Sequence, residues 1–276
     1  MGTLHLVATP IGNLEDVTLR SLRVLREADL VCAEDTRRTR ILLERYDIHA
    51  RPISVHAHNE ASRVAQVLEV LDAGGGVALV SDAGTPLLCD PGQRIVEAAI
   101  EAGHRVEASP GPSAVLTALA LSGLSGPPVC FLGDLPRRAS ARKKLFETYR
   151  ERPETLVFFE SPHRVGRSLA ELAGSLGARR ACVARELTKL HEEVVREDLV
   201  SLAERFAGPQ KGEFTLVVEG APESAEAVAW PEVEGQIVSR LAEGARPREI
   251  AAELALSTGQ PRREIYARAV ALRSPP

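Results

Sequence analysis

The sequence predicts an α/β protein, because short apolar and β-branched runs alternate with helical patterns along most of its 276 residues. Turns rich in glycine, proline and small polar residues follow several of these runs, which is typical of strands that lead into helices. We therefore expect mostly parallel strands. The length is sufficient for roughly two domains.

The strands and helices can be assigned in chain order. The expected strands are Leu4–Ala8, Leu30–Ala33, Val77–Ser81, Arg105–Ala108, Val129–Leu132, Thr155–Phe159, Ala181–Arg185 and Phe214–Glu219. One helix is predicted to begin near Pro91, with Asp90 as its acidic cap, and to end at Gly103. Another begins at Pro112-Ser113 and ends before the Gly/Pro-rich stretch 123–128.

That stretch predicts a junction between two α/β domains, 1–122 and 123–220. A linker follows from Ala221 to Glu226, and beyond it apolar residues recur at helical spacing in three short segments. These segments predict a helical module of helix-turn-helix type within 221–276. Such modules bind nucleic acid in many proteins, and they also serve as structural caps. Its glutamates slightly outnumber its arginines, which leaves both interpretations open.

The charge balance excludes a globally basic nucleic-acid-coating protein. The chain has 34 Lys and Arg against 38 Asp and Glu, a formal net charge of −4. Arginine supplies almost all the positive charge, which suits phosphate recognition but also results from a GC-rich genome. Basic residues concentrate around Arg37–Arg40 and Arg137–Arg152. Each cluster is either a solvated helix face or a local surface for a polyanion.

The cysteines and the N-terminus point to a protein of the reducing cytoplasm. The four cysteines form no C-x-x-C pair, so we expect small buried thiols and no metal site. No basic segment followed by an apolar one begins the chain, and no apolar stretch approaches the ~20 residues of a membrane helix. Export and membrane insertion are therefore not expected.

Several common catalytic motifs are absent. The sequence contains no G-x-G-x-x-G after a strand and no G-x-x-x-x-G-K-[ST], which argues against the usual dinucleotide fold and P-loop phosphoryl transfer. It also lacks H-E-x-x-H and G-x-S-x-G, which argues against the corresponding zinc proteases and serine hydrolases. The candidate chemistry lies instead where strands end in polar loops, because ligands of open α/β sheets bind at the carboxyl ends of strands.

Five such junctions occur, and each also has a purely structural interpretation. Residues 9–16 form a β-to-α turn in which Asp16 or Thr18 caps the next helix, or they bring polar groups to a strand tip. The small residues of 81–86 favour close approach of a flat ligand, with Asp82 facing a hydroxyl, an amine or a sulfonium. Residues 109–114 lead into a helix, and the backbone amides at the N-terminus of that helix suit an anion or a carboxylate. Residues 158–164 and 184–192 end strands in charged side chains, which are either functional groups or surface pairs.

Six segments together resemble one family. They are Thr9-Pro10-Ile11-Gly12-Asn13-Leu14-Glu15-Asp16, Ala33-Glu34-Asp35-Thr36-Arg37, Ser81-Asp82-Ala83-Gly84-Thr85-Pro86, Pro110-Gly111-Pro112-Ser113-Ala114, Phe159-Glu160-Ser161-Pro162-His163-Arg164 and Arg185-Glu186-Leu187-Thr188-Lys189. In this order they resemble the ribosomal RNA small subunit methyltransferase I family, ribose 2′-O-methyltransferases on the tetrapyrrole-methylase fold. The resemblance runs from about Gly2 to Glu219 and more loosely through the helical tail.

The resemblance implies a class III S-adenosylmethionine-dependent methyltransferase fold of two α/β domains with the cofactor between them. It also implies a homodimer and, as substrate, a cytidine in the decoding centre of small-subunit (16S) rRNA, within the assembled subunit. Carried over by position, the cofactor-binding residues would be Thr9, Pro10, Ser81, Asp82, Ala83, Gly84, Pro86, Ser113, Ala114, Leu132, Phe159 and Glu160.

The remaining candidates follow from the chemistry of methyl transfer to a ribose hydroxyl. This displacement needs alignment, a dry cleft and a base or charge near a weak nucleophile. The catalytic candidates are Glu34, Asp35, Glu160 and Lys189, which the sequence does not rank. The RNA-binding candidates are Asn13, Arg37, Arg38, Arg137, Arg138, Arg142, Lys143, Lys144, Arg164 and Arg185.

Two features bear on specificity. Residues 9–16 stand where tetrapyrrole-modifying relatives carry a glycine-rich loop, which favours RNA over a macrocycle. Asp134 occupies a position where relatives are expected to have an aromatic residue. A tetrapyrrole C-methyltransferase and a non-catalytic RNA- or nucleotide-binding α/β protein remain as alternatives.

Overall fold

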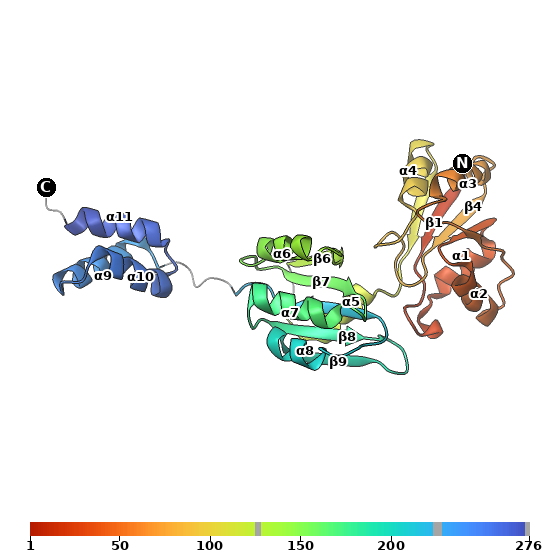
Figure 1. Ribbon diagram of the computed structural model, residues 1–276. Coiled ribbons are helices and arrows are strands. Elements are labelled where there is room, and N and C mark those ends of the chain that lie inside the picture. The colour runs from red at the N-terminus through yellow and green to blue at the C-terminus, as the bar shows by residue number, and fades with distance from the viewer. Residues whose placement is uncertain (125–127, 223–227, 274–276) are drawn as a thin grey trace. The chain divides into compact units, whose positions relative to one another are not determined.

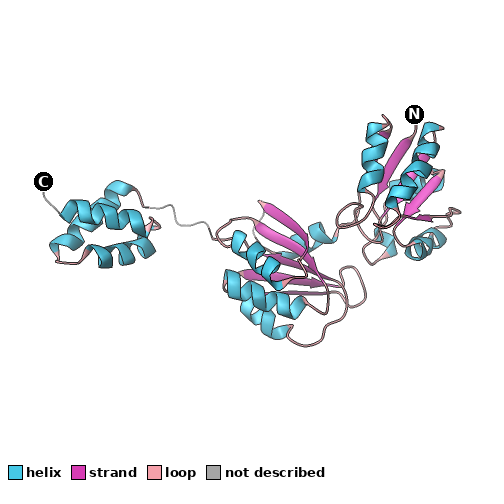
Figure 2. Ribbon diagram, turned by 45° about the horizontal axis from the view of Figure 1, so that its top comes forward, coloured by secondary structure: helices cyan, strands magenta, loops and turns pink. Residues whose placement is uncertain are grey.

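The computed structural model describes residues 1–124, 128–222 and 228–273. The chain divides into two compact units, Met1–Gly220 and Ala221–Pro276. The first contains two five-stranded sheets with their helices, and the second is the helical module (Figures 1 and 2). Parts of the predicted junction (125–127) and of the predicted linker (223–226) lie outside the described residues.

The first sheet is parallel throughout and confirms the α/β alternation. Its strands are β1 (Thr3–Val7), β2 (Leu30–Ala33), β3 (Ile53–Ser54), β4 (Gly76–Val80) and β5 (Arg105–Ser109), in the order β3-β2-β4-β1-β5. A short 3-10 helix, η1 (Leu14–Asp16), follows β1. Helices α1 (Leu19–Glu27) and α2 (Thr36–Arg45) pack on one face, and α3 (Glu60–Asp72) and α4 (Gln93–Glu101) pack on the other. With both faces covered, the strands are apolar without alternation.

The helix caps agree with the sequence in one case and differ in another. Thr18 caps α1 by accepting a hydrogen bond from the backbone of Ser21, as expected. The predicted cap of α4 is wrong, because α4 has Gly92 at its N-cap position and Asp90 lies outside the helix. A carboxylate from another helix compensates: Glu60 accepts the backbone N–H of Arg94 at 2.6 Å. Asp90 is thereby left for another role.

The second sheet is mixed, so the expectation of mostly parallel strands is wrong there. Its strands are β6 (Val129–Asp134), β7 (Thr155–Glu160), β8 (Arg180–Arg185), β9 (Glu193–Asp198) and β10 (Phe214–Val218), in the order β6-β7-β10-β8-β9. Only β6 and β7 are parallel. A short connection without a helix joins β8 to β9, and such a connection returns the chain antiparallel.

Helices cover both faces of the second sheet. On one face lie α6 (Ala139–Thr148), α7 (Val165–Leu176) and α8 (Leu199–Arg205), which share an apolar core with the strands. On the other face, α5 (Ala114–Ser122) places Val115 and Ala118 against Val157 and Cys182. The sequence division assigned residues 114–122 to the first domain; the apolar cluster that contains α5 includes strands of the second sheet together with Ile11 from the loop after β1.

Two glycines of α7 offer a matched test of how closely α7 and α8 pack. A Cβ on Gly166 would lie 2.3 Å from the carbonyl oxygen of Phe206, whereas a Cβ on Gly174 meets nothing within 4 Å. We expect Gly166→Ala to lower the free energy of unfolding by about 1–3 kcal/mol through overpacking. Gly174→Ala should raise it by up to about 1 kcal/mol through helix propensity. Urea denaturation of both variants checks this, and equal effects would contradict it.

The helical module contains the three helices that the sequence predicts. They are α9 (Trp230–Ala242), α10 (Pro247–Thr258) and α11 (Arg262–Arg273). Val233, Ile237, Ile250 and Ile265 form its core. Among the helices of the described residues, none has the length and apolar content that a membrane span requires.

The cysteines follow the expectation except at one position. Cys32 and Cys182 are buried, and burial raises the pKa of Cys32 to about 12. Cys130 is half-buried beside the Tyr149 hydroxyl. Cys89 is exposed and contradicts the expectation, because it lies in the loop after β4 rather than in a strand.

Candidate active site

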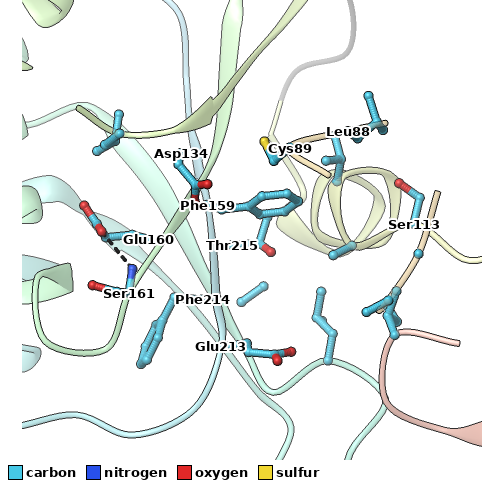
Figure 3. A pocket seen from close by; sticks show the side chains of 18 of the residues that line it. Leu88, Cys89, Ser113, Asp134, Phe159, Glu160, Ser161, Glu213, Phe214 and Thr215 are labelled. Carbon is cyan, nitrogen blue, oxygen red and sulfur yellow. Dashed lines mark hydrogen bonds between the residues drawn. The ribbon is translucent and has the colours of Figure 1, made fainter. Parts of the chain in front are cut away.

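A cavity of about 700 Å³ lies in the first unit, where the strand ends and loops of both sheets meet. Its volume falls within the roughly 300–1,000 Å³ of small-molecule sites. Figure 3 shows Phe159 between Asp134 and Thr215, with Leu88 and Cys89 from the loop after β4 nearby. The lining residues are Ile11, Ala83, Gly84, Thr85, Leu88, Cys89, Asp90, Ser113, Ala114, Val115, Asp134, Leu135, Pro136, Arg137, Phe159, Glu160, Ser161, Pro162, Arg164, Ala184, Leu187, Gly212, Glu213, Phe214 and Thr215.

The wall from the first sheet is built of small residues held by backbone hydrogen bonds. Thr9 follows β1 and pairs with Gly84, each donating its N–H to the other's carbonyl at 2.9 Å. The Thr9 hydroxyl also donates to the Ser81 carbonyl at 3.2 Å. Gly84 has φ +79°, and a Cβ there would lie 3.3 Å from the Ile11 side chain. The loop therefore needs glycine here, and the wall can approach a flat ligand closely.

The wall from the second sheet depends on its strand directions. Because β10 runs antiparallel to β7 and β8, its first residue Phe214 pairs with Glu160 and Arg185, the last residues of those strands. Strand β6 ends beside them with a register shift between Phe131 and Asp134. Four strand termini therefore contribute side chains at one edge of the sheet.

Acidic side chains from both sheets define the electrostatics of the cavity. Asp90 and Asp134 line it, and Glu34 and Asp82 lie near Asp90. Burial, then the nearby Glu34 carboxylate, raises the pKa of Asp90 to about 7, against an opposing hydrogen bond from Ser81. Burial and the Asp82 charge also raise the pKa of Glu34. This side of the cavity suits a bound cation or a group that gives up a proton.

Glu160 lines the cavity, but its carboxylate is engaged by the protein. Its side chain is fully buried. One oxygen accepts the Ser161 N–H at 2.7 Å and lies 2.6 Å from the Arg164 guanidinium. The other accepts the Ser168 hydroxyl at 2.5 Å. Three donors thus occupy three of the roughly four lone-pair sites of the buried carboxylate, so Glu160 anchors the turn from β7 to α7.

The structure brings half of the predicted cofactor-binding residues to the cavity. Those that line it are Ala83, Gly84, Ser113, Ala114, Phe159 and Glu160. The others lie behind the wall or away from it and are Thr9, Pro10, Ser81, Asp82, Pro86 and Leu132. Thr9 and Ser81 support the wall through their hydrogen bonds. Asp82 accepts the Asp35 N–H at 2.7 Å and so ties the ends of β4 and β2 together.

The other catalytic candidates do not line the cavity. Asp35 caps α2, and its hydrogen bonds with Arg37 hold its pKa down to about 2, which makes it a weak base. Burial opposes the charge of Lys189, but its hydrogen bonds to Glu186 and Glu213 outweigh burial and raise its pKa. Lys189 is thereby held as a cation beside Gly12, where a Cβ would meet its side chain at 2.6 Å.

The RNA-binding candidates are scattered. Arg137 and Arg164 line the cavity, and Arg37, Arg38, Arg138, Lys143 and Lys144 are exposed. The backbone of Asn13 donates to the Thr188 hydroxyl at 2.9 Å, and the Arg185 guanidinium donates to the Lys211 carbonyl at 2.8 Å.

Arg142 is the clear exception among them. It is 2% exposed, pairs with both oxygens of Glu171 at 2.7 and 2.9 Å, and donates to the carbonyls of Pro136 and Arg137. These bonds use four of the five N–H donors of the guanidinium, and the side chain is buried, so the RNA-contact prediction does not hold for Arg142. The Arg142 guanidinium instead holds in place the segment 135–137, which forms part of the cavity wall.

A matched pair of variants tests this structural role. Arg142→Gln should lower the free energy of unfolding by about 3 kcal/mol, because it removes a buried charge that pairs with Glu171 and bonds the carbonyls of Pro136 and Arg137. Lys143→Gln, at an exposed neighbour whose ion pair with Glu147 spans 3.9 Å, should change it by less than about 0.5 kcal/mol. Chemical denaturation measures both, and an unchanged Arg142→Gln midpoint would contradict the assignment.

Sequence reasoning missed several lining residues, above all Asp90. Its acidic side chain before Pro91-Gly92 has the pattern of a helix cap, and no local signal reveals that carboxylates from three other segments lie near it. Phe214 and Thr215 were assigned only to a strand. The cavity could have been sought at the start of that strand had its antiparallel direction been known.

Comparison with known proteins gives one consistent result. Residues 3–203 match the family described as Tetrapyrrole (Corrin/Porphyrin) Methylases. The chain is 46% identical over 272 residues to "Ribosomal RNA small subunit methyltransferase I" of Micromonospora olivasterospora, covering 96% of this chain and 85% of that protein. It is 43% identical over 270 residues to the protein of the same name from Xylella fastidiosa, covering 96% and 98%.

Solved structures agree on the fold. A diphthine synthase superposes with a TM-score of 0.60 at 17% identity, covering 79% of this chain and 90% of that one. A uroporphyrin-III C-methyltransferase from Thermus thermophilus, complexed with S-adenyl homocysteine, superposes with a TM-score of 0.55 at 20% identity, covering 78% and 97%.

Proposed function

This chain belongs to the tetrapyrrole methylase family and, within it, to the ribosomal RNA small subunit methyltransferases I, and on that premise we propose that it methylates small-subunit ribosomal RNA with S-adenosylmethionine. The observation that carries the proposal is the similarity to relatives of that name over 96% of the chain. The cavity of the first unit is the proposed site.

The cavity residues fit the cofactor. Ala83, Gly84 and Ala114 leave room for a flat ring beside the backbone, and the volume suffices for a molecule of this size. Asp90 and Asp134 offer negative charge to a sulfonium. Ser113 caps α5 by accepting the Leu116 N–H, so the α5 N-terminus faces the cavity with its positive dipole end, which suits a carboxylate. When bound, the cofactor supplies an activated methyl group.

The protein's own groups account for the rest of the proposed chemistry. We assign Asp90 as the residue that accepts the hydroxyl proton of the nucleophile, because a base works best with a pKa near the operating pH. Glu34 stays outside the cavity and keeps the pKa of Asp90 high through its charge. Apolar Leu135 and Phe159 exclude water from this part of the cavity. Arg137 lines the cavity and is exposed, which suits a substrate phosphate.

The finer proposal concerns the target. We assign the ribose 2′-oxygen of a cytidine in the decoding centre as the acceptor, with the assembled subunit as substrate and a homodimer in the cytoplasm as the working form. A ribose hydroxyl is a weak nucleophile that needs a base, and Asp90 meets that need. The loop from Thr9 to η1 carries Asn13, Glu15 and Asp16 in place of a glycine-rich loop, which favours RNA.

One experiment tests these assignments together. The protein is incubated with methyl-labelled S-adenosylmethionine and small subunits from a strain that lacks the enzyme, and the RNA is digested to nucleosides. Label in 2′-O-methylcytidine supports the full proposal. Label in a base or another nucleoside refutes the ribose-cytidine assignment alone. Label only in an added uroporphyrinoid macrocycle would overturn the RNA substrate, and a parallel reaction with protein-free rRNA reports whether assembly is needed.

A further inference from the structure

The helical module carries a groove of its own, about 350 Å³ in volume, between the N-terminus of α10 and one face of α11. It is lined by Arg246, Pro247, Arg248, Tyr266, Val270 and Arg273. All but Pro247 are exposed. These side chains belong neither to the apolar core of the module nor to the proposed active site.

The charges of the module are segregated around this groove. Arg240 pairs with Glu243 and Glu253, and Arg268 pairs with Glu234. In the described part of the chain, Arg246, Arg248 and Arg273 have no ion pair. The acid nearest in sequence, Glu249, turns back to accept the backbone N–H of Arg246 at 3.0 Å. The groove is therefore a local positive site on a chain of net charge −4.

The apolar part of the groove is a stripe along one face of α11. Tyr266, Val270 and Arg273 follow the i, i+4, i+7 spacing of a single helix face. Tyr266 is 46% exposed and Val270 is 41% exposed, whereas the neighbouring Ile265 and Ala269 are fully buried in the core. An exposed aromatic ring flanked by guanidinium groups is a platform on which an unpaired base stacks while its phosphates meet the cations.

We propose that this groove binds a single-stranded segment of the ribosomal RNA substrate, with phosphates at Arg248 and Arg273 and a base on Tyr266. Three arginines without ion pairs favour a polyanion, and the adjoining Tyr266 ring favours a nucleic acid over an acidic peptide. The inference rests on the proposed function and deepens it, because it assigns to the module a contact with the RNA that is additional to the cavity. The groove then contributes to substrate binding and leaves the methyl-transfer step unchanged.

Matched double variants of the full-length protein test the groove. Arg248→Gln/Arg273→Gln removes two groove charges, and Arg262→Gln/Arg263→Gln removes two exposed arginines of α11 that do not line the groove. We expect only the groove variant to raise KM for small subunits, by about tenfold or more, with kcat unchanged. It should also reduce the slope of log affinity against log salt by about 1.4, for two single-strand phosphates. Tyr266→Ala should weaken binding about tenfold with the salt slope unchanged.

The outcomes separate this inference from the proposed function. Equal KM values for the two double variants, with wild-type methylation of RNA intact, would overturn the groove and leave the function standing. A groove defect with intact subunits but none in anisotropy measurements with a fluorescein-labelled protein-free rRNA fragment would assign the groove to a ribosomal protein and refute RNA as its occupant. If the wild type methylates no RNA, the proposed function fails. Selective loss of fragment binding in the groove variant would still support the groove.

Discussion

Asp90→Asn should lower kcat by about 10²–10⁴-fold, the usual contribution of a positioned acid or base. Asparagine keeps the shape of the side chain but cannot accept the proton. Cofactor affinity, measured by calorimetry, should change far less than turnover. Asp134→Asn is the matched comparison, because it removes the other cavity carboxylate, which is assigned to the sulfonium charge, and it should weaken cofactor binding more than it lowers kcat. Turnover that is equal in the wild type and in Asp90→Asn would remove Asp90 from the chemistry.

The pH dependence makes this prediction sharper. A base must be ionised, so kcat/KM of the wild type should rise with pH and level off above about 7, the pKa of Asp90. The residual activity of Asp90→Asn should lack this step. A wild-type profile of kcat/KM that is flat from about pH 5 to about pH 9 would contradict the assignment.

The stability of the folded protein should also depend on the ionisation of Asp90. It should fall as pH rises, whereas activity should rise. Burial and Glu34 raise the folded-state pKa of Asp90 above its ordinary value of 3.8, so the folded protein binds the proton more tightly than the unfolded chain. The resulting stabilisation is present at acidic pH and is lost as pH rises through about 7. In Asp90→Asn this loss should disappear, and its Tm above neutral pH should exceed that of the wild type. Thermal melts across pH measure the difference.

The strand positions were predictable from the sequence because buried parallel strands are continuous apolar runs. All eight expected strands occur, and their ends differ from the expected ones by at most two residues. Two strands were missed. The strand β3 has only two residues, Ile53 and Ser54, and is too short to give a pattern. The strand β9 has Glu193, Arg196, Glu197 and Asp198, which give it the charged pattern of an edge strand. Strand direction was not predictable either, since the apolar content of β8 and β10 is the same in both orientations.

The candidate site was predictable only where local sequence determines it. The small residues Ala83 and Gly84 mark a wall, and they line the cavity. The role of a charged residue depends instead on partners distant in sequence. Glu160 and Arg142 carry the charges expected of functional groups, yet Ser168 and Glu171 engage them. Asp90 has the pattern of a cap, and three-dimensional proximity to Glu34 changes its pKa.

Glu160→Gln should lower the free energy of unfolding much more than a conservative substitution usually does. Three donors converge on the buried carboxylate, from Ser161, Arg164 and Ser168. A glutamine must turn its NH₂ group toward at least one of them, and it leaves the Arg164 charge unpaired. Breaking a buried pair costs about 3–5 kcal/mol, which corresponds to a fall in Tm of about 10 °C for a unit of this size. Glu204→Gln, at an exposed position of α8 without an ion pair among the described residues, should leave Tm unchanged.

The same variant separates anchoring from catalysis at Glu160. If the carboxylate only holds the turn from β7 to α7, kcat measured well below the Tm should remain close to that of the wild type once it is corrected for folded protein. A catalytic carboxylate would behave in the opposite way, with kcat reduced about 10²-fold or more at an unchanged Tm. The first result is expected, because both oxygens of Glu160 are already bonded to protein donors, including the Arg164 cation, whereas Asp90 lines the cavity with a raised pKa.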